Sequence, residues 1–303
     1  MTGTSFSLVI PAHDAAQTIA ATIASIRTQE GSPVEIVVID DGSSDGTQAA
    51  AQEAGATICR SQAQAGPGAA RNAGAALASG RYVWFLDADD LLLPGALAAV
   101  AAALARAPQA DFVLAGREDH MPDGSVATVL PMPLQSDRRR NLADFVLRRR
   151  KSIAIGSSIV QRRVLGRIRF PEGLRLAEDF VFHAQLLALF DGVVVATPVL
   201  DYRVDPRRLE RRSLAHADDM VRSADLAFDP AVIPADCMAL RRWYLARVHL
   251  SLFRAFHRSG DDAAARPHFH EALRLAPARA LRLAYLRKYL RGLAGRRHPS
   301  LAS

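Results

Sequence analysis

The chain has 303 residues, of which 50% are hydrophobic and 23% are charged, so it can bury one large core or two modest ones. This balance excludes a disordered chain, and no apolar run reaches the roughly 18 to 20 residues that a membrane-spanning helix needs. We expect one main domain with an appendage.

The positive charge lies mainly in the last part of the chain. From Arg241 onward there are 14 Lys and Arg against 3 Asp and Glu, which leaves 24 against 28 for the residues before it. The net charge of +7 therefore belongs to the tail and does not indicate nucleic-acid binding by the main body. Cys59 and Cys237 lack the spacing of a zinc site, and residues 1–7 lack the features of a signal peptide, so we expect a cytoplasmic protein.

The first 60 residues predict strand–helix units of the kind that bind mononucleotides. An apolar strand over residues 6–11 is followed by a helix that Asp14 is expected to cap. A second strand over residues 34–39 ends in the acidic turn DDGSSDGT, where a carboxylate can accept a hydrogen bond from a base or ribose. An ordinary turn between strand and helix stays open as the alternative.

A third strand over residues 57–60 precedes a glycine-rich loop and a helix over residues 69–79. Arg71 and Asn72 are expected in the first turn of this helix, where free backbone N–H groups and the helix dipole favour a phosphate. Taken alone, Arg71 is more typical of an ion pair with an acid on the surface.

The strongest local signal is the apolar strand over residues 82–86 and the acids that follow it. Asp87, Asp89 and Asp90 come at its carboxyl end, which in open α/β sheets is the edge where ligands bind. Clustered carboxylates there suit Mg²⁺ or Mn²⁺ carrying a diphosphate. The alternative is a solvated turn before the helix that Pro94 opens.

Four motifs occur in a fixed order, namely SLVIPAHD, VVIDDGSSDGT, GPGAARNAG and WFLDADD. With this order and spacing, the first 95 residues closely resemble the family 2 glycosyltransferases, and the resemblance continues more weakly to about Ser213. It implies an α/β fold of the GT-A type, a Rossmann-like mixed sheet flanked by helices. It also implies a nucleotide-sugar donor, a divalent metal (Mn²⁺ or Mg²⁺) and inversion at the anomeric carbon.

The resemblance assigns the donor nucleotide to the first two loops. Pro11, Ala12 and Asp14 match the first donor-binding loop, and Asp41 matches the acid that contacts the base. The pair His13-Asp14 departs from the family, which usually has an aromatic residue followed by Asn. Stacking of the base on this loop is therefore left open.

The resemblance also assigns residues to the diphosphate and the metal. Arg71 matches the basic residue near the donor, and Asp87 and Asp89 match the D-x-D pair, with Asp89 and Asp90 nearest the metal. In glycosyltransferases of this type, an acidic pair after the acceptor region supplies the general base.

That acidic pair matches Glu178 and Asp179, which open an amphipathic helix. Acids at a helix start also stabilise the helix dipole, which is the structural alternative. The resemblance makes Asp179 the catalytic base and Glu178 a substrate-binding neighbour. Tyr202-Arg203 resembles the YR that follows the last strand of the catalytic domain, and Arg203 is taken as substrate-binding.

Two basic segments have open assignments. Residues 136–151 are expected to form mostly a solvated helix face, with attraction of an anionic acceptor such as a lipid-linked pyrophosphate as the alternative. The tail after Arg274 interleaves leucines with Arg and Lys, as is typical of a helix on an anionic membrane. Docking on the catalytic domain or on a partner is equally consistent with this pattern.

We therefore predict a glycosyltransferase domain over residues 1–213 and a basic helical extension over residues 214–303. Residues 1–95 would bind the donor, and residues 96–213 would hold the acceptor and the base. The predicted reaction moves a sugar from a nucleoside diphosphate, with UDP favoured, to a hydroxyl of a growing glycan or glycolipid, as in cell-surface polysaccharide synthesis. The alternative is a non-catalytic binding module of the same fold, while a nucleotidyltransferase is disfavoured because residues 11–14 contain no glycine.

Overall fold

The computed structural model describes residues 5–31, 34–147 and 153–293, and for residues 206–209 it describes the backbone only. The chain divides into two compact units, Met1–Asp205 and Pro206–Ser303. The division lies at the start of helix α7 (Pro206–Ala215), whereas the sequence analysis placed it after Ser213. Because α7 is continuous through residue 213, a boundary there would cut a helix.

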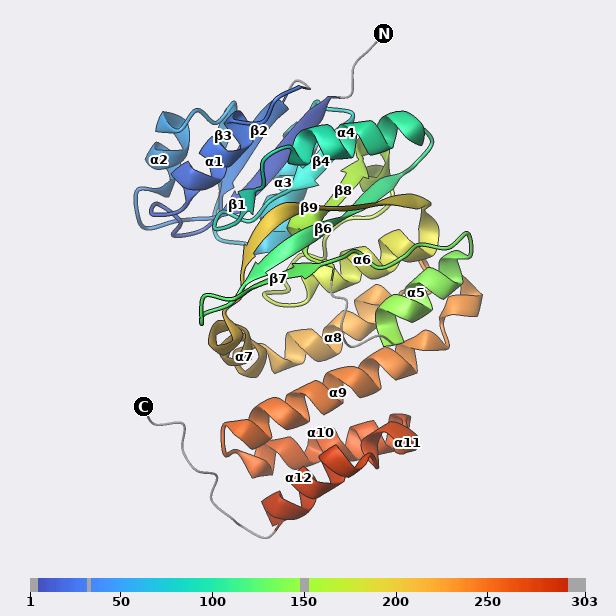
Figure 1. The fold of residues 1–303 in the computed structure, drawn as a ribbon. Coiled ribbons are helices and arrows are strands. Elements are labelled where there is room, and N and C mark those ends of the chain that lie inside the picture. The colour runs from blue at the N-terminus through green and yellow to red at the C-terminus, as the bar shows by residue number, and fades with distance from the viewer. Residues whose placement is uncertain (1–4, 32–33, 148–152, 294–303) are drawn as a thin grey trace. The chain divides into compact units, whose positions relative to one another are not determined.

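The first unit is built on one mixed sheet of nine strands (Figure 1). Their order is β3-β2-β1-β4-β8-β6-β9-β5, with β7 paired to β6. The strands are β1 (Phe6–Ala12), β2 (Val34–Asp40), β3 (Ile58–Ser61), β4 (Tyr82–Phe85), β5 (Leu91–Leu92), β6 (Phe112–His120), β7 (Val126–Val129), β8 (Ser158–Gln161) and β9 (Gly192–Arg203).

The strand directions bring the carboxyl ends of strands from both halves of the sheet to the same edge. Strands β1 to β4 run parallel to one another, and β8 is antiparallel to both β4 and β6. Consequently β6, and β9 which is parallel to it, run in the same direction as β1 and β4. The strand order reverses beside β1, and in open α/β sheets ligands bind outside the carboxyl ends at such a point.

Helices cover both faces of this sheet. They are α1 (Ile19–Arg27), α2 (Thr47–Glu53), α3 (Pro67–Leu77), α4 (Ala96–Arg106) and α6 (Glu178–Leu189). Helix α5 (Arg138–Leu147) packs on α6, where Phe145 stacks on Phe180. Since alternate strand residues point to opposite faces, Leu8 and Ile10 share one apolar cluster with α1, α2 and α4. Val9 faces α3, and Phe85 contacts Phe182 of α6 on the other side.

The second unit consists of helices. They are α7, α8 (Ala217–Ala227), α9 (Leu240–Arg258), α10 (Asp262–Leu275), α11 (Pro277–Ala280) and α12 (Leu283–Leu293). Helices α9 and α10 form a hairpin: Gly260 between them has a φ of 84°, and the Asp261 side chain accepts from the Ala264 N–H at 2.9 Å. In the described part of the chain, no helix combines the length and the apolar character that crossing a bilayer requires.

The close packing of α3 on β1 depends on a glycine, which gives a first prediction. A Cβ at Gly74 would lie 2.3 Å from Val9 Cγ1 and 3.2 Å from Ile39 Cγ1. Although alanine usually stabilises a helix relative to glycine, Gly74→Ala should lower the free energy of unfolding by about 1–3 kcal/mol because the buried valine has no room to move. Urea denaturation measures this. Gly166→Ala, where a Cβ meets nothing within 4 Å, is the control; equal stability of the two variants would contradict the close packing.

Candidate active site

The turn after β4 carries the clustered carboxylates predicted from the sequence. It is fastened to α1, because the Thr22 hydroxyl donates to the Ala88 carbonyl at 3.0 Å, and the Asp90 N–H closes the turn on the Asp87 carbonyl at 3.1 Å. Asp89 is exposed and Asp87 half-buried, whereas Asp90 is only 3% exposed. Burial, and then the charges of Asp87 and Asp89, raise the pKa of Asp90 to about 9.

A buried arginine joins this turn to the start of α6. Arg71 of α3 donates from Nη2 to Asp87 Oδ1 at 2.7 Å and from Nη1 to Glu178 Oε1 at 2.8 Å. Its guanidinium also lies 5.2 Å from the centre of the Phe170 ring. Burial acts against the charge, but the two carboxylates hold the pKa of Arg71 above its usual value. The guanidinium therefore stays charged in the interior.

Arg71 is thus not placed as the sequence suggested. Helix α3 begins at Pro67 rather than residue 69, because the fixed φ of proline suits the first helical position. Arg71 and Asn72 therefore lie beyond the free N–H groups, and the Asn72 side chain donates to the Phe170 carbonyl at 2.9 Å. The predicted place in the first turn is wrong. Arg71 does pair with acids, although in the interior and not on the surface, and its assignment to the donor stays a prediction.

The predicted acidic pair opens α6, and its two members have different surroundings. Ala177 before it has a φ of 70°, a left-handed conformation that costs a non-glycine residue roughly 1–2 kcal/mol. Glu178 is 6% exposed, and its carboxylate forms an ion pair with Arg71. Asp179 accepts from the Phe180 N–H at 2.7 Å. Withdrawal from water, and then the charge of Glu178, raise the pKa of the Asp179 carboxyl to about 7.

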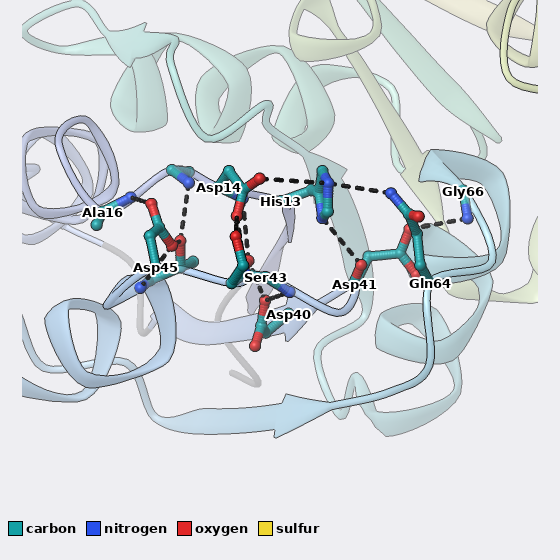
Figure 2. A network of polar contacts seen from close by, with 12 residues as sticks. His13, Asp14, Ala16, Asp40, Asp41, Ser43, Asp45, Gln64 and Gly66 are labelled. Atoms are coloured by element: carbon teal, nitrogen blue, oxygen red, sulfur yellow. Dashed lines mark hydrogen bonds and ion pairs between the residues drawn. The ribbon is translucent and has the colours of Figure 1, made fainter.

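Asp41, which the resemblance assigns to the base, is turned toward the loop after β3. Its Oδ1 accepts from the Gln62 side chain at 2.8 Å and from the Ala65 N–H at 2.9 Å. Its Oδ2 accepts from the Gly66 N–H at 2.8 Å (Figure 2). Asp41 is only 4% exposed. A carboxylate has about four acceptor sites, so these three donors leave room for one more.

The loop after β1 is tied to the acidic turn after β2. Asp14 Oδ1 accepts from the Ser44 N–H at 2.8 Å, and Asp45 Oδ2 accepts from the Ala16 N–H at 3.1 Å (Figure 2). Asp14 therefore does not cap α1, which begins at Ile19, and the predicted cap is wrong. The side chain is instead used to hold two loops that are far apart in sequence.

His13 links this first loop to the loop after β3. Its Nδ1 lies 3.1 Å from the Asp41 carbonyl oxygen, and its Nε2 lies 3.0 Å from the Gln64 amide nitrogen and 3.6 Å from the Asp14 carboxylate (Figure 2). No motif in the sequence indicates this contact of Gln64. The His13 imidazole thus connects the loop after β1 with the loop after β3.

Three further predicted residues lie on strands that end at this edge. Pro11 and Ala12 are the last residues of β1, and Arg203 is the last residue of β9. Pro11 is half-buried, Ala12 is buried and Arg203 is exposed. Of the basic stretch over residues 136–151, Arg138 pairs with Asp191 at 2.5 Å, and residues 148–151 lie outside the described part of the chain.

The second half of the sheet adds polar side chains that the sequence analysis did not select as site residues. Arg117 Nε of β6 donates to Asp119 Oδ1 at 2.6 Å, and its guanidinium lies 5.6 Å from the centre of the Tyr202 ring. Burial, and then the charges of Asp90 and Asp87, raise the pKa of Tyr202 to about 12. The phenol of Tyr202 is therefore near the acidic turn and stays protonated.

A histidine and an acid complete this group. His120 Nε2 lies 3.4 Å from Asp201 Oδ1, and neither atom has a hydrogen-bond partner among the described residues. Strand β6 runs to His120, so this histidine lies at the carboxyl end of the strand. The charge of Asp201 also contributes to the raised pKa of Asp90.

Comparison with known proteins decides the family. The model of Glycosyl transferase family 2 matches residues 7–167, which is more than half of the chain. The chain belongs to this family. The family predicted from the four motifs is confirmed.

Two relatives of this glycosyltransferase are named for polysaccharide biosynthesis. The succinoglycan biosynthesis protein ExoO of Rhizobium meliloti is 33% identical over 240 residues, which cover 73% of this chain and 67% of that protein. The amylovoran biosynthesis glycosyltransferase AmsB of Erwinia amylovora is 27% identical over 215 residues, which cover 67% of this chain and 71% of that protein.

Solved structures share the fold. The crystal structure of S. aureus TarS 1–349 has a TM-score of 0.66 at 19% identity and covers 96% of this chain and 89% of that chain. The mannosyltransferase PcManGT from Pyrobaculum calidifontis, in complex with GDP-Man and Mn²⁺, has a TM-score of 0.56 at 19% identity and covers 96% of this chain and 84% of that chain. The likeness confirms the predicted GT-A fold of the glycosyltransferase.

The carboxylates of the glycosyltransferase fit a divalent cation only together with ligand atoms. Among the described residues, no three His, Cys, Asp or Glu side chains are grouped so that they could hold an ion by themselves. Asp90 Oδ2 is buried and has no hydrogen-bond partner in that part of the chain, so it is an acceptor left open for a cation. Mg²⁺ is usually held by one or two carboxylates, substrate phosphates and water, a manner of binding that Asp89 and Asp90 fit.

The Arg71 bridge gives the second prediction. Arg71→Met should lower the free energy of unfolding by about 3–5 kcal/mol, because it leaves Glu178 and Asp87 without their buried partner. Chemical denaturation measures the loss. Arg163→Met is the matched control: its ion pair with Asp111 is also 2.8 Å long, but the arginine side chain is 63% exposed, so a loss below about 1 kcal/mol is expected. Similar losses of unfolding free energy in both variants would contradict the prediction that the buried ion pairs of Arg71 stabilise the fold more than an exposed pair does.

Proposed function

We propose that this glycosyltransferase moves a sugar, with inversion at the anomeric carbon, from a nucleoside diphosphate to a hydroxyl of a growing glycan or glycolipid. The observation that carries the proposal is the difference between two neighbouring acids at the start of α6. Glu178 is held by Arg71, whereas Asp179 has a carboxyl group whose pKa is raised to about 7. A base with a pKa near neutrality is suited to accept a proton from a hydroxyl.

In the proposed reaction, the acceptor hydroxyl attacks the anomeric carbon on the face opposite the diphosphate. As the new carbon–oxygen bond forms, the hydroxyl proton passes to Asp179, and the bond from the anomeric carbon to the diphosphate oxygen breaks with its electron pair on the diphosphate. Glu178 keeps its ion pair and positions the helix. The base and the acidic turn are held together by Arg71 through Glu178 and Asp87.

We assign the diphosphate to the acidic turn. Asp87, fixed by Arg71, would bind the donor there, and Asp89 and Asp90 would hold Mn²⁺ or Mg²⁺. The metal would supply positive charge that stabilises the leaving diphosphate. The presence of Mn²⁺ in the PcManGT complex supports this assignment.

We assign the nucleotide to the loops after β1 and β2, with Pro11, Ala12, Asp14 and Asp41 as its contacts. The acceptor site left on Asp41 suits an N–H of the base. Uridine is the favoured base, and a structure of TarS in complex with UDP-GlcNAc supports it, whereas PcManGT holds GDP-Man. Arg203 at the end of β9 is assigned to substrate binding.

We assign the acceptor to polysaccharide synthesis on the support of the two relatives, which are named for succinoglycan and amylovoran biosynthesis. The acceptor would be a glycan or a lipid-linked sugar. A lipid-linked acceptor lies at a membrane, so the protein would work in the cytoplasm at the inner face of that membrane.

The third prediction tests the base. Asp179→Asn keeps the volume of the side chain but cannot accept a proton, so transfer should fall by about 10²- to 10⁴-fold while donor affinity stays unchanged. Glu178→Gln should lose less transfer but more stability, because it weakens the ion pair with Arg71. Transfer rates, donor titration calorimetry and thermal denaturation of both variants separate the two acids.

The pH profile adds a readout that a purely structural part for Asp179 would not produce. Since only the ionised carboxylate accepts a proton, kcat/KM of the parent should fall about tenfold per pH unit below about 7 and level off above it. In Asp179→Asn, this fall of kcat/KM at low pH should be absent. Transfer at close to the parent rate, with the fall at low pH unchanged, would end the assignment of Asp179.

The fourth prediction tests the metal residues. Asp89→Asn and Asp90→Asn should each weaken the Mn²⁺-dependent part of nucleoside diphosphate binding, measured by calorimetry with and without the ion. Asp90→Asn should leave the metal-free protein at least as stable as the parent, because burial disfavours the Asp90 charge. Asp123→Asn, which changes an acid in the exposed turn before β7, is the control. Parent-like Mn²⁺ dependence in both variants would overturn the metal assignment.

A further inference from the structure

Helix α12 packs into the helical unit by the face opposite its leucines. Tyr285 is 3% exposed and Gly292 is buried, whereas Leu283, Leu290 and Leu293 are 59%, 54% and 51% exposed. An amphipathic helix in a globular protein normally turns its apolar side to the core. In α12 the apolar side points outward, and no described element of the helical unit covers it.

The three exposed leucines and the half-buried Leu286 form one continuous strip. At 3.6 residues per turn, positions separated by three, seven and ten residues fall on the same side of a helix. The strip, called the leucine strip below, consists of Leu283, Leu286, Leu290 and Leu293.

A basic strip runs beside the leucine strip. By the same helical geometry, Arg287 and Arg291 follow the leucine strip around the outer face, and both are exposed. Residues 272–303 contain eight Lys and Arg and no Asp or Glu. Glu271, just before this range, pairs with Arg274, which lies on α10 and not on α12. The outer face of α12 is therefore apolar on one side and cationic on the other.

We propose that α12 lies on an anionic membrane, with the leucine strip in the headgroup region and Arg287 and Arg291 at lipid phosphates. An apolar strip beside a cationic strip is the arrangement by which helices bind in the plane of an interface. At 11 residues, α12 is far too short to cross a bilayer. Pairing of two copies through the leucine strips would bring two cationic strips together, which disfavours a dimer. The inference concerns the helical unit alone and holds whatever the donor and acceptor are.

Vesicle flotation of the full chain tests the proposal. The protein should float with vesicles of phosphatidylcholine and phosphatidylglycerol, less with phosphatidylcholine alone, and less again at high salt, because basic residues near an anionic surface act through screened charge. Equal recovery with both vesicle types, insensitive to salt, would overturn it. Failure to float with either would overturn it as well.

Two double variants separate the strips. Arg287→Gln with Arg291→Gln should weaken binding to anionic vesicles about 30-fold, at about tenfold per 1.4 kcal/mol and about 1 kcal/mol for each charge. Leu283→Ser with Leu290→Ser should weaken binding roughly tenfold or more while retaining the salt dependence. Parent-like binding of either double variant would contradict the assigned face.

Matched controls show whether the effect belongs to α12. Leu130→Ser changes a leucine that is 53% exposed in the first unit, and Arg266→Gln changes an exposed arginine of α10. Both should bind vesicles like the parent, and circular dichroism of all variants should match it. If the leucine variant instead abolishes a dimer seen by ultracentrifugation, the strip is a contact between copies and the membrane proposal fails.

Discussion

The buried guanidinium of Arg71 is the constraint on which the rest of the site depends. A charge in the interior is tolerated only when partners oppose it closely, and here they come from Asp87 after β4 and Glu178 at the start of α6. The two ion pairs of Arg71 therefore hold the start of α6 next to the acidic turn, although these segments are far apart in sequence. Its charge also reaches His183: burial first, and then Arg71, lower the pKa of that buried imidazole to about 3, so it stays neutral.

The same bridge gives the two adjacent acids at the start of α6 different surroundings. Glu178 accepts a hydrogen bond from Arg71, whereas burial, and then the charge of Glu178, raise the pKa of the Asp179 carboxyl to about 7. Environments of this kind are how one site obtains carboxyl groups with different tasks. The left-handed backbone at Ala177 sets the direction in which α6 starts. The surroundings of Asp179 therefore support its proposed role as the base, in addition to the resemblance.

The sequence could predict whatever depends on neighbours along the chain. Strands that end in acids, the start of α6 and the hairpin of α9 and α10 all follow from local apolar periods and turn residues. The antiparallel strand β8 was missed because its partners β4 and β6 are distant from it in sequence. The predicted helix cap at Asp14 and the predicted helix-start position of Arg71 failed for the same reason. Asp14 accepts a hydrogen bond from Ser44 and Arg71 donates one to Glu178, and both partners are distant in sequence.

The two sides of the sheet edge differ in how far the protein satisfies them by itself. At the loops after β1 and β2, Asp14 and Asp41 already accept hydrogen bonds from neighbouring loops. At the acidic turn and the ends of β6 and β9, buried atoms of Asp90, Asp201 and His120 have no hydrogen-bond partner among the described residues. An unsatisfied buried polar atom costs roughly 1–3 kcal/mol, a cost that a bound group can remove. The loops that we assign to the nucleotide are thus held by the protein's own hydrogen bonds, whereas the side that we assign to the diphosphate keeps polar atoms that a bound ligand can satisfy.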